Sequence, residues 1–226
     1  LPAGLATGDL NLVVSAIENS GTGTPNTPSG YTALATFANV GLYGKIAGSS
    51  ESAPSCSYTG GAAAAATTAQ CAAFRRAALA ALATPATQLN GSAANIAYPG
   101  LTVSTKNCIV VYIAWKQDGT GSSIATLAGF NELGDIVNAN GQMLSWGYVI
   151  QTTATNISSG TLTVTGGASA ISRAILVPLS GIPDVLSNDV YRLATGAPLT
   201  QGTLVGRDVP PNGTVNDWRA GAAVDW

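Results

Sequence analysis

The sequence predicts an all-β protein, an antiparallel β-sandwich (jelly-roll or Ig-like) built from two pseudo-repeated halves and followed by an extended C-terminal arm. The first observation is a series of short apolar runs, rich in Val and Ile, which Gly-rich turns separate and no strongly amphipathic helix interrupts. The second is a set of five landmarks that occur in the same order in residues 2–76 and 99–180. Together they predict about ten to twelve short strands, which is typical of sandwiches and barrels.

The landmarks are turn, apolar and aromatic signals that are weak singly, but their common order favours a duplication. We therefore expect half-repeats at 1–83 and 84–182, and a separate arm at 183–226. The matched pairs are Pro2-Ala3-Gly4 with Pro99-Gly100, residues 10–14 with 108–112, Gly30-Tyr31 to Leu34 with Gly129-Phe130 to Leu133, Tyr43-Gly44 with Trp146-Gly147, and Thr59-Gly60-Gly61-Ala62 with Thr165-Gly166-Gly167-Ala168.

In the first half, apolar or alternating residues predict strands at 10–17, 31–37, 40–47 and 56–59. The Ala-rich stretch 62–83 favours helix by propensity alone. Its match to residues 170–179 predicts a strand at 68–75 instead, because tertiary pairing often overrides propensity. A short helical turn would then fit only at 77–83.

In the second half, residues 84–98 are predicted to form a connector that ends in a lead-in strand at 95–98. The first half has only Leu1 in the corresponding place, which predicts a further strand upstream of Leu1. The remaining strands of this half are expected at 108–115, 124–133, 143–152, 160–165 and 170–179.

Charged residues make up 9% of the chain, against about 25% in an average domain. This composition favours secreted, cell-surface or virion β proteins over intracellular enzymes. The net charge is −2 and the only adjacent basic pair is Arg75-Arg76, so a phosphate-binding groove for nucleic acid is not expected. No apolar run reaches the ~18 residues that a membrane helix needs, so no membrane insertion is expected.

The chain has no histidine, which excludes Ser–His and Cys–His catalysis and most zinc sites. Asp9 follows Gly8 and is expected to close a turn through its side chain. We predict no catalytic residue, cofactor or metal; the hydrolase alternative needs two convergent carboxylates. The other acids of the repeat are expected to be solvated loop residues: Glu18, Glu51, Asp118, Glu132 and Asp135. The one oxygen-rich cluster that suggests calcium is Asn131, Glu132, Asp135, Asn138 and Asn140.

The chain has three cysteines, Cys56, Cys71 and Cys108, and an odd number in a chain of this size argues against a full disulfide framework. We interpret them as buried thiols that act as small apolar side chains. The alternative is a bridge between Cys56 and Cys71.

Residues 183–226 lie outside the repeat, and prolines interrupt them. Their spaced apolar residues favour an extended arm that binds another surface over a disordered tail. The predicted partner-binding residues are Tyr191, Leu193, Leu199, Leu204, Val205, Trp218 and Trp226.

Exposed aromatic residues would suit a carbohydrate-binding face, because sugar rings stack on them. Trp115 ends its predicted strand beside Lys116 and is the candidate at a rim. Tyr43 and Trp146 are expected in the core, because they occupy matching positions of the repeat.

Residues 1–180 resemble a widespread class of phage and prophage virion proteins. Those proteins carry a PAG…GDLL, then a P-x-G-[WY], then a YYK-x-A-x-x-x-E pattern, followed by a degenerate second copy. The residues that carry the resemblance are Leu1 to Leu10, Pro28-Ser29-Gly30-Tyr31, Leu42-Tyr43-Gly44-Lys45-Ile46-Ala47-Gly48-Ser49 and Glu51.

The resemblance implies a β-sandwich virion component without catalytic residues. The expected function is therefore a non-enzymatic structural protein of the particle, as a head decoration, a fibre or a tail accessory. It would dock through its C-terminal arm onto other capsid or tail proteins and associate with copies of itself. The alternative is a carbohydrate-binding or host-adhesion module that contacts a surface glycan through Trp115.

Overall fold

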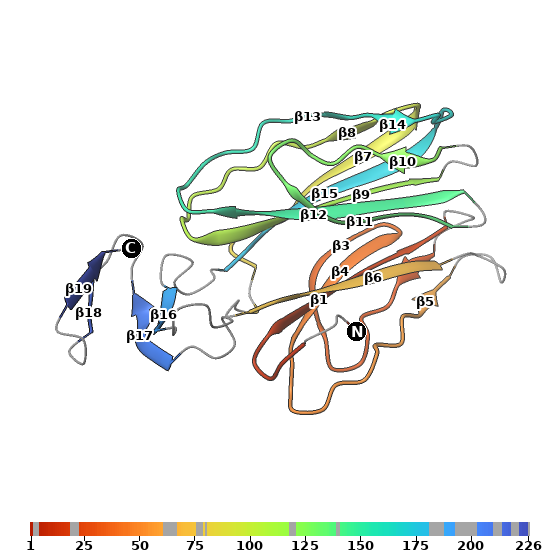
Figure 1. Cartoon of the computed structure of the whole chain (residues 1–226). Helices are drawn as coiled ribbons and strands as arrows, with labels where there is room; N and C mark the ends of the chain where they lie inside the picture. Colours follow the sequence, from red (N-terminus) through yellow and green to blue (C-terminus); the bar gives the residue numbers. More distant parts are fainter. Residues whose placement is uncertain are drawn as a thin grey trace. The chain divides into compact units, whose positions relative to one another are not determined.

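The computed structural model describes residues 1, 5–18, 23–60, 67–75, 79, 81–117, 121–138, 141–180, 188–192, 203–209, 214–217 and 222–225. Every regular element in this part of the chain is a β-strand, and every strand pair is antiparallel, which confirms the predicted fold class (Figure 1). The chain divides into two units, Leu1–Ile182 and Pro183–Trp226.

Two sheets form the body of the first unit. The first sheet has four strands in the order β3-β4-β1-β6, namely Thr32–Phe37, Val40–Ile46, Leu10–Ile17 and Thr67–Phe74. The second sheet has five strands in the order β11-β12-β9-β15-β7, namely Asn131–Val137, Gln142–Gln151, Cys108–Gln117, Ala170–Leu179 and Ala86–Ala93.

Three short strand pairs complete the unit. The pair β2–β5 belongs to the first half of the chain, and the pairs β10–β14 and β8–β13 belong to the second half. Their bounds are Thr24–Pro25, Tyr58–Thr59, Ser123–Ile124, Val164–Thr165, Ile96–Tyr98 and Gly160–Leu162.

The two sheets pack face to face, because one apolar cluster takes alternate side chains from both of them. Leu12 and Leu42 enter it from the first sheet, and Trp115 and Trp146 enter it from the second. Across the interface, the rings of Phe74 and Tyr148 meet edge to face with their centroids 4.9 Å apart.

A second apolar cluster lies on the opposite face of the second sheet. There Tyr112 and Leu176 are covered by Ile96 of β8, Leu162 of β13 and Val164 of β14. The second sheet is therefore buried on both faces, which explains why β9 and β15 are almost continuously apolar.

The two halves of the chain have the same strand order, since β3-β4-β1-β6 corresponds to β11-β12-β9-β15. The ladder between the first two strands is also irregular at the same place in each half. An extra residue lies between Ala33 and Ala35 in one half and between Glu132 and Gly134 in the other. The first sheet has no described counterpart of β7.

When the two halves are aligned at that extra residue, the predicted match of Tyr43 with Trp146 is wrong by one residue. Tyr43 lies opposite Ala33, and Gly147 lies opposite Glu132. Tyr43 therefore corresponds to Gly147, and it points away from the interface that Trp146 faces. Both aromatic side chains are nevertheless fully buried, as predicted.

Three other predictions change. The strand predicted in place of an Ala-rich helix is confirmed as β6. The predicted connector 84–98, in contrast, contains the eight-residue strand β7. The single strand predicted at 124–133 is instead β10 and β11, with a loop between them. In the proposed helical turn at 77–83, residues 77, 78 and 80 lie outside the described residues; the other four are not helical, and Ala81 forms a β-bridge with Leu179.

The second unit contains two strand pairs of its own. β16 pairs with β17, and β18 pairs with β19, over Asn188–Arg192, Thr203–Val209, Thr214–Asp217 and Ala222–Asp225. That this segment is an extended arm remains a prediction.

Candidate functional site

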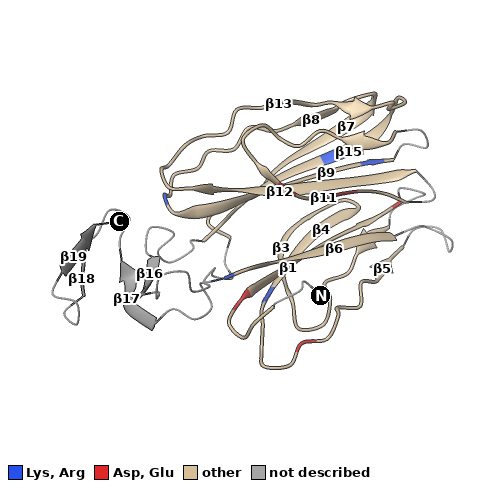
Figure 2. Cartoon of the chain, viewed as in Figure 1, with Lys and Arg blue, Asp and Glu red and all other residues tan. Residues whose placement is uncertain are grey.

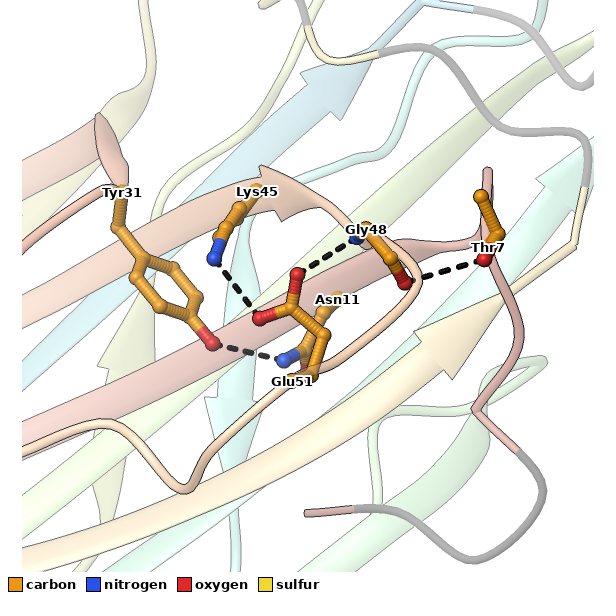
Figure 3. Close-up of polar contacts among 6 residues, drawn as sticks. All are labelled: Thr7, Asn11, Tyr31, Lys45, Gly48 and Glu51. Carbon is orange, nitrogen blue, oxygen red and sulfur yellow. Dashed lines mark hydrogen bonds and ion pairs between the residues drawn. The ribbon is translucent and has the colours of Figure 1, made fainter.

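The sequence phrases that carry the virion resemblance meet at one end of the first sheet (Figure 3). Thr7 comes from the segment before β1, Tyr31 precedes β3, Lys45 lies near the end of β4, and Glu51 lies in the loop that follows. We call the residues Thr7, Asn11, Tyr31, Lys45, Gly48 and Glu51 the rim network.

The segment before β1 is held by a side-chain turn. The Asp9 carboxylate accepts a hydrogen bond of 2.9 Å from the Ala6 N–H, which confirms the role predicted for Asp9. Gly8 adopts φ +89°, a conformation that favours glycine, and its N–H donates to the Ala47 carbonyl at 2.8 Å. The turn therefore fixes the start of β1 beside the end of β4.

The Glu51 carboxylate joins two parts of the rim network. Its Oε1 accepts a hydrogen bond of 2.6 Å from the Gly48 N–H, and its Oε2 pairs with Lys45 Nζ at 2.7 Å. These two bonds, the Gly48 amide first, lower the pKa of Glu51 below its ordinary value. Thr7 Oγ1 donates to the Gly48 carbonyl at 3.1 Å, so the loop is tied to the segment before β1 as well.

Tyr31 forms the other side of the rim network. Its hydroxyl oxygen accepts a hydrogen bond of 2.7 Å from Asn11 Nδ2, and Lys45 Nζ lies 5.9 Å from the centre of its ring. Burial, followed by the nearby charge of Glu51, raises the pKa of Tyr31. The Oδ1 atom of Asn11 is buried and has no hydrogen-bond partner among the described residues.

Two hollows flank Glu51. One, of about 490 Å³, lies between Tyr31, Lys45 and the Ser- and Pro-containing loop 52–57. The other, of about 380 Å³, lies between Glu51, Gly48 and the segment 5–7. The carboxylate pairs with an ammonium and accepts from a backbone N–H, so the rim network fastens three segments together.

Glu51 and Lys45 are among few charged side chains in the described part of the chain, and these are scattered over both sheets (Figure 2). Within that part, no group of three or more acidic or cysteine side chains could hold a metal ion. No described helix is long and apolar enough to cross a membrane.

Glu132 and Asp135, predicted as solvated loop acids, lie instead on strand β11. The extra residue Leu133 turns both side chains to the same face, although their spacing would otherwise place them on opposite faces. Burial raises the pKa of Asp135; its hydrogen bond from the Ile124 N–H opposes this rise, and the charge of Glu132 adds to it.

The predicted calcium cluster does not assemble among these residues. Asn138 donates to Gln142 Oε1 at 2.7 Å and to the Thr68 hydroxyl at 3.2 Å, so it links β6 to the second sheet instead. Asp135 is engaged by the Ile124 N–H, and Asn140 lies outside the described residues.

Trp115, the predicted glycan contact, is fully buried. It belongs to the core between the two sheets, where the Arg173 guanidinium lies 5.8 Å from the centre of its ring. The prediction that it lies at a rim is wrong.

Of the predicted partner-binding residues, Tyr191 lies on β16, and Leu204 and Val205 lie on β17. Four others lie outside the described residues: Leu193, Leu199, Trp218 and Trp226.

Cys108 is buried, as predicted, whereas Cys56 and Cys71 are only partly buried. All three are free thiols in the structure. Burial raises the pKa of the Cys56 thiol, and the neighbouring Cys71 raises it further.

Neutralising Glu51 is expected to remove a pH-dependent part of the stability. The pKa of Glu51 is lowered by folding, so the carboxylate stabilises the folded state above its ordinary value of 4.5, and this contribution disappears as the pH falls through the lowered value. Urea unfolding of Glu51→Gln should therefore show a deficit against wild type at pH 7 that closes at acidic pH.

The variant Lys45→Met is the matched control, because it keeps the Gly48 N–H bond to Glu51 and removes only the ammonium. Lys45→Met should lose part of the pH-dependent stability that Glu51→Gln loses. A Glu51→Gln deficit that is equal at pH 7 and at pH 3 would show that the carboxylate charge contributes nothing.

No protein-family model, no curated protein and no solved structure matches the chain.

Proposed function

We propose that the chain is a non-enzymatic structural protein of a bacteriophage particle. The observation that carries this proposal is the convergence of Asp9, Tyr31, Lys45 and Glu51 on one end of the first sheet. The pattern that resembles that of virion proteins consists of residues that fasten neighbouring segments at this end of the first sheet. A chain that keeps this pattern has retained the scaffold of such proteins.

The low charge content supports the same assignment. Charged residues are 9% of the chain, so the surface is covered mainly by Ser, Thr, Asn, Gln and Gly. Such a surface suits a protein packed among neighbours in a particle. The second unit, Pro183–Trp226, is divided from the sandwich and would attach the protein to those neighbours.

Particles produced with a chain that lacks residues 183–226 test the proposal. Quantitative mass spectrometry of purified particles should find the full chain in a fixed copy number and the shortened chain strongly depleted. Circular dichroism of the shortened chain checks that its β structure is kept. Equal incorporation of both chains would refute attachment through this unit, and absence of the full chain from particles would refute the virion assignment.

A further inference from the structure

Cys71 lies on the face of the first sheet that points away from the second sheet. On β6, Ala72 and Phe74 belong to the core between the sheets, and side chains alternate between the two faces of a strand. Cys71 lies opposite Val13 of β1, which in turn lies opposite Tyr43 of β4. Because residues that face each other across a ladder share one side of the sheet, these three side chains form a row on its outer face.

The segment that contains Cys56 lies over this row. The buried Tyr43 hydroxyl donates to the Pro25 carbonyl at 2.9 Å, and Pro25 pairs with Tyr58, so the strands β2 and β5 cover the outer face. Cys56 is two residues before Tyr58 in the same segment. Both of these side chains are half-buried, whereas Ser57 between them is exposed. The Cys56 side chain therefore points inward, toward the face that carries Cys71.

The second half shows that the two positions come together in the fold. When the halves are aligned at the extra residues of β3 and β11, the ladders through β1 and β9 make Leu176 the counterpart of Cys71. The equivalent pairs β2–β5 and β10–β14 make Leu162 the counterpart of Cys56. Both leucines belong to the one apolar cluster on the outer face of the second sheet. The first half thus has two thiols where the second half has two packed leucines.

The two thiols also influence the same ionisable groups. Burial raises the pKa of the Cys56 thiol, and the neighbouring Cys71 raises it further. After burial and the charge of Glu51, both cysteines add to the raised pKa of Tyr31. Cys56 and Cys71 are only partly buried, which leaves them open to a small reagent, whereas Cys108 is fully buried.

We propose that Cys56 and Cys71 are a site of covalent modification, where an external disulfide oxidises the two thiols to a disulfide bond. One cysteine thiolate attacks a sulfur of the external disulfide, forms a mixed disulfide and releases one external thiolate. The second cysteine thiolate then attacks the protein sulfur of the mixed disulfide, and the second external thiolate leaves. The protons of the two protein thiols pass to the released thiolates, so the external disulfide ends as two thiols.

The bond fastens the segment before β5 to β6 and closes a loop of residues 57–70. A cross-link of this kind stabilises the folded state mainly by restricting the unfolded chain. It forms in any oxidising surroundings, whichever particle or surface carries the protein.

Glutathione disulfide, added to the intact reduced chain, is the probe. After oxidation the chain is unfolded in urea in the presence of an alkylating reagent. Mass spectrometry should find a loss of two hydrogen atoms, no alkyl group on Cys56 or Cys71, and an alkylated Cys108. Proteolysis should release the peptides of Cys56 and Cys71 as one linked pair, and the midpoint of urea unfolding should be higher than for the reduced chain.

The variants Cys56→Ser and Cys71→Ser are the matched controls, because each keeps one thiol of the pair. Circular dichroism checks that they fold; they should stop at the mixed disulfide with glutathione and show no rise in the midpoint. Cys108→Ala should form the bond as wild type does.

Four results would overturn the proposal. The folded chain could fail to react with glutathione disulfide, or it could keep mixed disulfides that never close. The bond could form only in urea, or it could involve Cys108 or a second molecule. A bond that leaves the midpoint of unfolding unchanged would refute its stabilising role.

Discussion

Replacing Lys116 with Met is expected to lower the free energy of unfolding by roughly 3 kcal/mol, because it leaves buried carbonyls without their donor. Lys116 is fully buried at the end of β9, and its Nζ donates to the carbonyls of Ala93, Ala94 and Ala168. The first two lie at the turn between β7 and β8, and the third lies just before β15. One ammonium therefore fastens two separate segments over the second sheet. Urea unfolding followed by tryptophan fluorescence measures the loss.

The matched control is Lys106→Met, since Lys106 is exposed in the loop before β9. It should change the stability by no more than about 0.5 kcal/mol. A Lys116→Met chain as stable as the Lys106→Met chain would mean that water replaces the ammonium at all three carbonyls.

Replacing Trp115 with Ala is expected to cost about 3–5 kcal/mol, the usual loss for a buried tryptophan. The side chain is fully buried between the sheets, and its removal also takes away the ring that lies 5.8 Å from the Arg173 guanidinium. Trp115→Phe should cost less, because the indole N–H has no acceptor among the described residues and its loss breaks no hydrogen bond. Thermal unfolding of both variants gives the comparison.

Leu89→Ala is the control for an apolar truncation outside the core, because Leu89 is 59% exposed. A Trp115→Ala chain that unfolds like Leu89→Ala would contradict the core position of the tryptophan. The expected result also affects the adhesion alternative. Loss of glycan binding in Trp115→Ala would reflect unfolding of the sandwich and not a missing sugar contact.

The strands could be predicted from the sequence where apolar and polar residues alternate or where the landmarks of the two halves follow the same order. The repeat correctly replaced an Ala-rich helix with β6, because a strand pair contributes more than the small difference in propensity. The exposure of single side chains was not predictable in the same way. Trp115 and Lys116 end an apolar run beside polar residues, yet both are buried by segments that are distant in sequence.

The rim network illustrates the same limit. The resemblance marked Tyr31, Lys45 and Glu51 as a pattern, but alternation could not predict that they touch. Strict alternation would place Glu132 and Asp135 on opposite faces of β11, but the extra residue Leu133 brings both side chains to the same face. A bulge is set by the fit between two strands, and a single strand's sequence does not reveal it.

Because of the one-residue offset between Tyr43 and Trp146, the two halves could not exchange equivalent strands without a cost in packing. In the first sheet the ring of Tyr43 lies over Gly41, and in the second sheet the ring of Tyr112 lies against Gly147. A tyrosine ring thus covers the same part of each sheet, and it belongs to β4 in the first half and to β9 in the second. Recombination that exchanged β1 with β9 would place two tyrosines opposite each other in one sheet and leave a hole in the other.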